Sequence, residues 1–90
     1  MFVAPYVSSP LPVVRQMLML AELRKGETFF DLGAGDGRSV IMAAQEFGAK
    51  AIGIELREDL AKRALSTIAE LGIEDKAQIL QADFFNIDLR

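Results

Sequence analysis

Hydrophobic positions along the chain follow two spacings, one typical of amphipathic helices and one typical of short buried strands. Helical spacing is found over residues 9–26, 39–47 and 58–71. Short apolar, β-prone segments occupy residues 28–32, 51–54 and 77–82. Strands that alternate with helices of this length predict an α/β fold, a Rossmann-like parallel sheet with right-handed crossovers and helices on both faces, preceded by an N-terminal helix.

Residues that favour helix termini lie at the ends of these helical segments. Ser9 is a candidate N-cap for the first helix, with Pro10 at its first position. Gly26, Gly48 and Gly72 follow the three helices, where glycine commonly ends a helix. These residues set the expected bounds of the helices.

The composition is that of a folded domain, and it is unusually apolar for its length. Of the 90 residues, 51% are hydrophobic and 26% are charged, which excludes a disordered tail. Three prolines in the first twelve residues predict an extended arm over residues 1–12, and residues 13–90 form the core. Because a domain this small normally buries little surface, we expect part of the folded unit to be missing.

Several kinds of site and location are excluded by what the chain lacks. It has no cysteine and no histidine, so disulfides, thiolate metal sites and Ser–His or Cys–His catalysis are excluded within it, and no metal site is predicted. The net charge of −3 argues against nucleic acid and anionic membranes as partners. The apolar N-terminal segment lacks a basic region and is divided by Arg15, so it predicts neither a signal peptide nor a membrane span, and a cytoplasmic protein is expected.

Acidic residues lie at the ends of all three predicted strands. Asp31 lies near the end of the first strand, Glu55 directly follows the second and Asp83 directly follows the third. In parallel sheets, ligands bind beyond the carboxyl ends of the strands. We therefore expect the three carboxylates to line one edge of the sheet, where a ligand would bind.

A glycine-rich loop over residues 31–37 joins the first of these strands to the next helix. Its spacing is G-x-G-x-G, whereas a dinucleotide fingerprint would need a further glycine where Arg38 stands, and no Walker A sequence follows. Asp36 places a negative charge beside the helix N-terminus, where a pyrophosphate would otherwise bind. The loop alone is compatible with a purely structural role, but a cofactor that carries positive charge suits it better than one that carries phosphates.

Two further features favour a nucleoside ligand. Glu55 lies about 20 positions after Gly33, the offset of an acid that accepts hydrogen bonds from ribose hydroxyls. Asp83 is followed by Phe84 and Phe85, which can provide an acceptor for an adenine amino group and a ring that packs on the purine. Glu55 could equally be a solvated acid at a strand end, and one of the two phenylalanines is expected to be ordinary core.

Three segments resemble, in order, the three cofactor motifs of class I S-adenosylmethionine-dependent methyltransferases. They are residues 29–37, the Gly-Ile-Glu run that ends at Glu55 and the Ala-Asp-Phe run that ends at Phe84. The N-terminal run from Pro5 to Pro10 and the Gly-Asp-Gly-Arg run narrow the resemblance to the archaeal and mitochondrial protein-lysine methyltransferases. It implies S-adenosylmethionine as cofactor and a protein lysine as acceptor. The reaction would be an in-line displacement at the sulfonium methyl group by a neutral amine. A non-catalytic module of the same fold and a methyltransferase for a small molecule or nucleic acid remain alternatives.

The same resemblance assigns a role to each cofactor-binding residue. Asp31 would hold the methionine amino group, and Gly33, Ala34 and Gly35 would let the cofactor cross the loop. Glu55 would bind the ribose. The remaining contacts would come from the two ends of the chain, with Asp83 and Phe84 at the adenine and Tyr6 and Ser9 over the methionine end. Asp36 and Arg38 belong to the loop signature, where either would cap the next helix or pair across it, and no residue is predicted as a general base.

The family fold has more strands than this chain supplies, including one beside the first predicted strand. The resemblance therefore implies that residues 1–90 are the N-terminal, cofactor-binding portion of a methyltransferase domain. Without that strand, residues 28–32 would form an apolar edge. Because an exposed apolar edge strand can pair with another chain, we expect self-association through this edge or its completion by a missing partner segment.

Overall fold

The computed structural model of the chain describes residues 2–4 and 10–82. Seven elements follow one another in the order β1 (Phe2–Ala4), α1 (Leu11–Leu20), β2 (Thr28–Leu32), α2 (Arg38–Phe47), β3 (Lys50–Glu55), α3 (Glu58–Leu71) and β4 (Ala77–Gln81). The predicted strands and the second and third predicted helices are thereby confirmed to within one or two residues.

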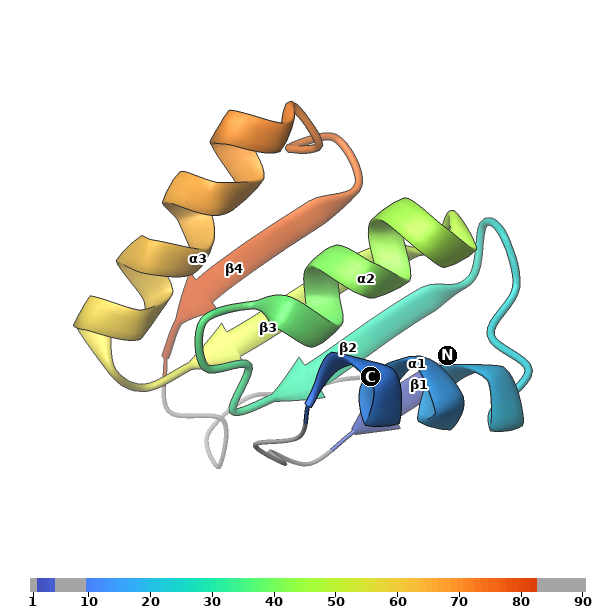
Figure 1. Ribbon diagram of the computed structural model, residues 1–90. Helices are drawn as coiled ribbons and strands as arrows, with labels where there is room; N and C mark the ends of the chain where they lie inside the picture. The colour runs from blue at the N-terminus through green and yellow to red at the C-terminus, as the bar shows by residue number, and fades with distance from the viewer. Residues whose placement is uncertain (1, 5–9, 83–90) are drawn as a thin grey trace.

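The four strands form one parallel sheet in the order β1-β2-β3-β4. Thr28 to Leu32 of β2 pair with Lys50 to Ile54 of β3, and Ala51 to Glu55 of β3 pair with Ala77 to Gln81 of β4. The carboxyl ends of β2, β3 and β4, drawn as arrowheads, lie at one end of the sheet, where the glycine loop lies (Figure 1). Asp31 and Glu55 therefore lie at the same end of the strands, as predicted.

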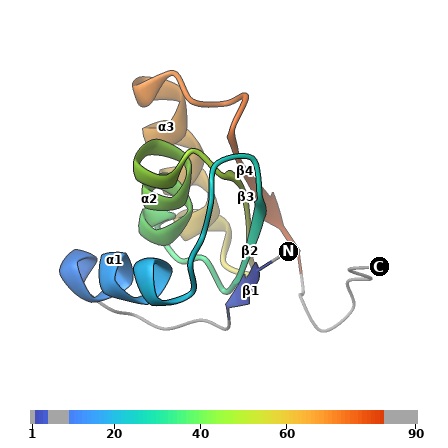
Figure 2. The ribbon, with the colours of Figure 1, turned by 90° about the vertical axis from the view of Figure 1, so that its right-hand side faces the viewer.

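The three helices lie on one face of the sheet (Figure 2). The expectation was helices on both faces. The strand order explains the difference, because every crossover steps in the same direction and right-handed crossovers in one direction place their helices on the same side. The two faces of the strands differ accordingly: Phe29 is 1% exposed on the helix side, whereas Leu80 on the other side is 50% exposed.

The outer edge of β2 is covered, which corrects the prediction of an exposed edge over residues 28–32. Phe2, Val3 and Ala4 pair in parallel register with Phe29, Phe30 and Asp31. Of the arm predicted over residues 1–12, residues 2–4 form a strand on the edge that would otherwise be free, whereas Leu11 and Pro12 already belong to α1. Self-association through that edge therefore loses its structural basis.

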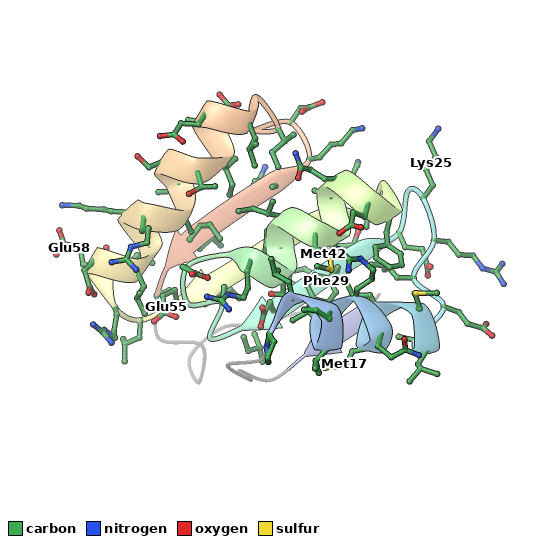
Figure 3. The ribbon with its side chains drawn as sticks, viewed as in Figure 1. Met17, Lys25, Phe29, Met42, Glu55 and Glu58 are labelled. Carbon is green, nitrogen blue, oxygen red and sulfur yellow. The ribbon has the colours of Figure 1, made fainter. Side chains whose placement is uncertain are left out.

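The core lies between the sheet and the helices and is made of side chains from every layer. Phe29 of β2 lies beneath α2, close to Met42 (Figure 3). Val40 of α2 and Ile68 of α3 are also fully buried. Leu18 of α1 belongs to the same cluster. The core therefore joins all three helices to the sheet.

The apolar face of α1 is narrower than its sequence suggests. Val14 and Leu18 are buried, whereas Val13 is 47% exposed and Met17 lies on the outer side of the helix (Figure 3). Arg15 forms a 2.9 Å ion pair with Glu46 of α2.

None of the helices in residues 10–82 has the length and hydropathy needed to cross a membrane.

The first helix ends at Leu20, several residues before the predicted end at Gly26. Glu22 adopts a left-handed conformation with φ 57°, and its N–H donates to the carbonyl of Met19. The N–H of Leu23 donates to the carbonyl of Leu18, and both side chains are buried. This is a Schellman motif, in which glycine usually occupies the position of Glu22. The pattern of apolar residues could not reveal this end, because the residue at the turn is a glutamate.

Glu22→Gly is expected to raise the free energy of unfolding by about 0.5–1 kcal/mol, because glycine adopts the left-handed conformation without the steric cost that a Cβ imposes. Urea denaturation of the two proteins measures the change. The matched control is Glu70→Gly, which alters an exposed glutamate inside α3 and should lower stability by about 1 kcal/mol. Destabilisation by both substitutions would contradict the assigned helix end.

Candidate functional site

The glycine loop between β2 and α2 is fixed to the neighbouring strand by its backbone. The N–H groups of Gly33 and Ala34 donate to the carbonyl of Ile54 at 2.7 and 3.1 Å. Gly33 and Gly35 have φ values of 83° and 59°, in the left-handed region that favours glycine. The predicted need for glycine at these positions is confirmed, and the loop has one defined path across the end of β3.

Gly53 of β3 provides the space in which this loop packs. A Cβ atom at Gly53 would lie 2.7 Å from the Cβ of Ala34 and 2.7 Å from the Cδ1 of Ile79. It would also lie 2.9 Å from the Cγ2 of Val40 in α2. Because such contacts are too short to be tolerated, the absence of a side chain at Gly53 lets the loop and α2 lie directly on the sheet.

Glu55 holds the loop from beneath. One carboxylate oxygen, Oε1, accepts a hydrogen bond from the N–H of Gly35 at 2.7 Å, and Oε2 accepts from the N–H of Arg57 at 2.8 Å. The residue is only 6% exposed, at the carboxyl end of β3 (Figure 3). The carboxylate therefore joins the glycine loop to the segment that leads into α3.

Asp31 is the buried acid at the end of β2. It is 6% exposed, and its Oδ2 accepts a hydrogen bond from the hydroxyl of Ser39, at the start of α2. Burial raises the pKa of Asp31, the Ser39 hydrogen bond opposes that rise, and the charge of Glu55 adds to it. Within the described part of the chain, no lysine or arginine lies within ion-pair distance of this carboxylate. A ligand with a positive charge would supply the missing partner.

The two arginines near the site are paired with acids close to them in sequence. Arg38 Nη2 lies 3.0 Å from Asp36 Oδ2, and the backbone N–H of Arg38 also donates to Asp36. The Arg38 hydrogen bond lowers the pKa of Asp36, which therefore stays ionised. Asp36 thus both pairs with Arg38 and accepts a backbone N–H at the start of α2, the two roles that the sequence left open. Arg57 Nη2 lies 2.8 Å from Asp59 Oδ2.

A cavity of about 270 Å³ opens over the loop. Its lining comes from α1, the end of β2, the loop, the start of α2, the residue before α3 and the first turn of α3. The lining residues are Val14, Asp31, Gly33, Ala34, Gly35, Asp36, Arg38, Ser39, Arg57 and Leu60. Small-molecule sites usually measure about 300–1,000 Å³. The cavity therefore accommodates part of a nucleoside cofactor.

The structure brings together most of the predicted site residues that it describes. Asp31, Gly33, Ala34 and Gly35 line the cavity, and their contacts with a cofactor stay predictions. Glu55 is not among the lining residues, because its two oxygens bind the backbone beneath the loop. The other predicted contacts lie outside the described residues and stay predictions: Tyr6, Ser9, Asp83 and Phe84.

Four lining residues were not assigned by the sequence analysis: Val14, Ser39, Arg57 and Leu60. Ser39 had a usable signal, since it carries a hydroxyl in the first turn of the helix that follows the loop, close to the end of β2. In the sequence pattern, Ser39 marks only the start of that helix. Val14 and Leu60 carry no comparable signal, because apolar residues at helical spacing indicate core first.

The geometry supports binding of a ligand that has a cationic group and hydrogen-bond donors. The cationic group would pair with Asp31 and thereby offset the cost of its buried charge. Asp36 lines the cavity as a carboxylate, which disfavours a phosphate at the N-terminus of α2. These features separate the cavity from a dinucleotide or triphosphate site.

Comparison with known families gives a match over most of the chain. Residues 12–90 match the family model described as mycolic acid cyclopropane synthetase. The chain is also similar to a protein-lysine N-methyltransferase of Saccharolobus islandicus, at 40% identity over 86 residues, covering 94% of this chain and 53% of that protein.

Two further similarities extend the comparison. The crystal structure of an RNA methyltransferase from Salinibacter ruber in complex with S-adenosyl-L-homocysteine matches with a TM-score of 0.88 and 43% identity, over 92% of this chain and 54% of that one. A sphingolipid C9-methyltransferase of Komagataella phaffii is 36% identical over 64 residues, which is 70% of this chain and 13% of that protein. The chain thus spans about half the length of the Saccharolobus and Salinibacter proteins and 13% of the Komagataella protein.

Proposed function

This chain belongs to the S-adenosylmethionine-dependent methyltransferase family, and on that premise we propose that its glycine-loop cavity binds S-adenosylmethionine. The observation that carries the proposal is the buried carboxylate of Asp31, which lines the cavity, accepts a hydrogen bond from the hydroxyl of Ser39 and forms no ion pair with a lysine or arginine of residues 10–82. The ammonium of the methionine part would pair with Asp31. A neutral ligand, or one that presents phosphate, would leave that carboxylate uncompensated.

The other residues of the site fit the remaining parts of the same cofactor. Gly33 and Gly35 expose backbone along the cavity without side chains in the way. Each oxygen of Glu55 accepts one backbone hydrogen bond and retains a lone pair that ribose hydroxyls could use. In the proposal, Asp83 and Phe84 contact the adenine, and Tyr6 and Ser9 cover the methionine end; these four residues are assigned by the resemblance.

The chemistry that follows is methyl transfer by in-line displacement. When bound, S-adenosylmethionine supplies a methyl group on a sulfonium; the acceptor nitrogen forms a bond to that methyl as the sulfur–carbon bond breaks, and a neutral thioether leaves. The acceptor amine must lose a proton to attack. In this proposal the described residues contribute orientation and a site that excludes water, and no general base is assigned.

We propose that this chain is cytoplasmic and that its methyl acceptor is the amine of a protein lysine. Its support is the 40% identity to the Saccharolobus protein-lysine methyltransferase over nearly the whole of this chain. RNA is the second candidate, supported by the 43% identity to the Salinibacter RNA methyltransferase, although the net charge of −3 does not favour a polyanion.

A transfer assay separates these acceptors from each other and from a non-catalytic module. The chain would be incubated with methyl-labelled S-adenosylmethionine and a cell extract, followed by separation of protein, RNA and lipid. Label recovered as methyl-lysine after protein hydrolysis supports the proposal. Label in nucleosides or lipid redirects the acceptor, and no transfer despite cofactor binding indicates a binding module.

Cofactor choice is tested by calorimetry with S-adenosylmethionine, S-adenosylhomocysteine and NAD. We expect the first two to bind and NAD to bind at least about 100-fold more weakly, since its pyrophosphate would lie beside the Asp36 carboxylate. Glu55→Ala should weaken binding of the first two. The proposal fails if this variant retains full affinity for S-adenosylmethionine and binds NAD better.

A further inference from the structure

The hydroxyl of Ser39 lies between the candidate cofactor cavity and the buried acid of β2. Its Oγ donates a hydrogen bond to Oδ2 of Asp31, and both residues line the cavity. Ser39 is the second residue of α2, directly beyond the glycine loop, so its position relative to Asp31 is fixed by the loop and by the packing of α2 on the sheet. The family motifs recognised in the sequence do not include it.

The surroundings of Asp31 show why this contact matters. Glu55 on β3 adds a second negative charge, and Asp36 in the loop a third, which Arg38 of α2 pairs. Arg57, before α3, lines the same cavity but pairs with Asp59, and α1 contributes the apolar Val14. Among the described residues, the Ser39 hydroxyl is therefore the hydrogen-bond donor that favours the charged form of Asp31.

We propose that Ser39 is a positioning residue of the cofactor site, whose hydroxyl orients the Asp31 carboxylate toward the ammonium of S-adenosylmethionine. The inference rests on the proposed function. Without the hydroxyl, the buried Asp31 would have one hydrogen bond fewer in its charged form and would take up a proton at higher pH. A protonated Asp31 cannot form the charge-assisted bond that the ammonium requires.

The test compares the chain with Ser39→Ala, Ser39→Thr and the control Ser66→Ala, which removes a hydroxyl from an exposed serine on α3. Affinity for S-adenosylmethionine is measured by calorimetry between pH 5 and 8 at constant ionic strength. Ser39→Ala should bind about 10-fold more weakly and lose affinity at a higher pH than the unaltered chain as the solution is acidified. Ser39→Thr, which keeps the hydroxyl, should have the same affinity and the same pH midpoint as the unaltered chain. Ser66→Ala should change neither the affinity nor the midpoint.

The shift of the pH midpoint separates positioning from a merely structural role, because general damage to α2 would weaken binding without moving the midpoint. A ¹³C NMR titration of the Asp31 carboxyl group in the ligand-free chain gives an independent readout. It should show a raised pKa in Ser39→Ala.

Unchanged affinity and midpoint in Ser39→Ala, with normal binding by the unaltered chain, would overturn the role of Ser39 and leave the proposed function standing. An unshifted carboxyl titration in Ser39→Ala would also overturn it. Absence of binding by the unaltered chain at any pH would overturn both proposals.

Discussion

Asp31→Asn is expected to lower the affinity for S-adenosylmethionine by about 10- to 100-fold, the cost of losing a hydrogen bond to a charged partner. The substitution keeps the size of the side chain and an oxygen for the Ser39 hydroxyl, but it removes the charge that the ammonium would pair with. It should also stabilise the ligand-free chain at pH 7 by about 0.5–2 kcal/mol, since a buried charge without a cation is costly to the fold.

The pH dependence of this stability gain follows from the raised pKa of Asp31. A carboxyl whose pKa is higher in the folded state contributes stability below its ordinary pKa of 3.8, and that contribution is lost as the pH rises through the raised value. The Asn variant does not titrate there. The stability difference between variant and unaltered chain should therefore be small near pH 4 and grow toward pH 7, as measured by urea denaturation.

Asp75→Asn is the matched control. It removes an exposed carboxylate before the amino end of β4, at the opposite end of the strands from the glycine loop. It should leave the affinity for the cofactor unchanged. Equal affinity of the Asp31→Asn variant and the unaltered chain would contradict the assigned ammonium site. A stability gain of the same size at every pH would contradict the assigned burial effect.

Glu55→Gln is expected to destabilise the fold by about 1–3 kcal/mol and to weaken cofactor binding by at least about 10-fold. Both carboxylate oxygens accept backbone N–H groups, from Gly35 and from Arg57. An amide offers one oxygen and one NH₂ group, so a donor would face a donor on one side. Either the glycine loop or the start of α3 would then lose its attachment.

Glu58→Gln serves as the control for this change. Glu58 is exposed and forms a surface ion pair of 2.7 Å with Lys62 one turn along α3. Its substitution should alter stability by less than about 0.5 kcal/mol. If the Glu55→Gln variant were as stable as this control, the carboxylate would not be holding the loop.

The parallel sheet and the course of the loop were predictable from the sequence because local signals agree with the global fold there. The segment from Thr28 to Leu32 has both β propensity and a glycine loop directly after it, and Gly48 and Gly72 end helices whose apolar spacing also ends there. Where pattern and terminus agree, the predicted bounds are within one or two residues of those observed.

Features that depend on partners distant in sequence were not predictable in this way. β1 forms because Phe2 to Ala4 pair with the edge of β2. The sequence of an arm that contains prolines does not indicate this pairing. The end of α1 depends on the left-handed conformation of Glu22, which is unusual for a glutamate. Two backbone hydrogen bonds stabilise it, from the N–H of Glu22 to Met19 and from the N–H of Leu23 to Leu18. In both cases tertiary or turn geometry outweighs local preference.

The candidate site shows the same division. Asp31 and Gly33 were found from type and spacing, since a strand end and a glycine turn constrain both. The position of Glu55 beneath the loop was not foreseen, because spacing places a residue at a strand end without showing which backbone groups its oxygens bind. Ser39 was missed for a related reason: its role depends on the side chain that it meets.

The most direct measurement of the central claim is an NMR titration of the ¹⁵N-labelled chain with S-adenosylhomocysteine, which follows every backbone amide. Binding at the proposed site should shift the amides of Gly33, Gly35 and Ser39, and that of Arg57 across the cavity, while those of Gly72 and Lys76 at the opposite edge stay unchanged. Saturable shifts confined to these cavity residues would confirm that the loop is a cofactor site. No shifts at millimolar ligand, or shifts centred elsewhere on the chain, would contradict it.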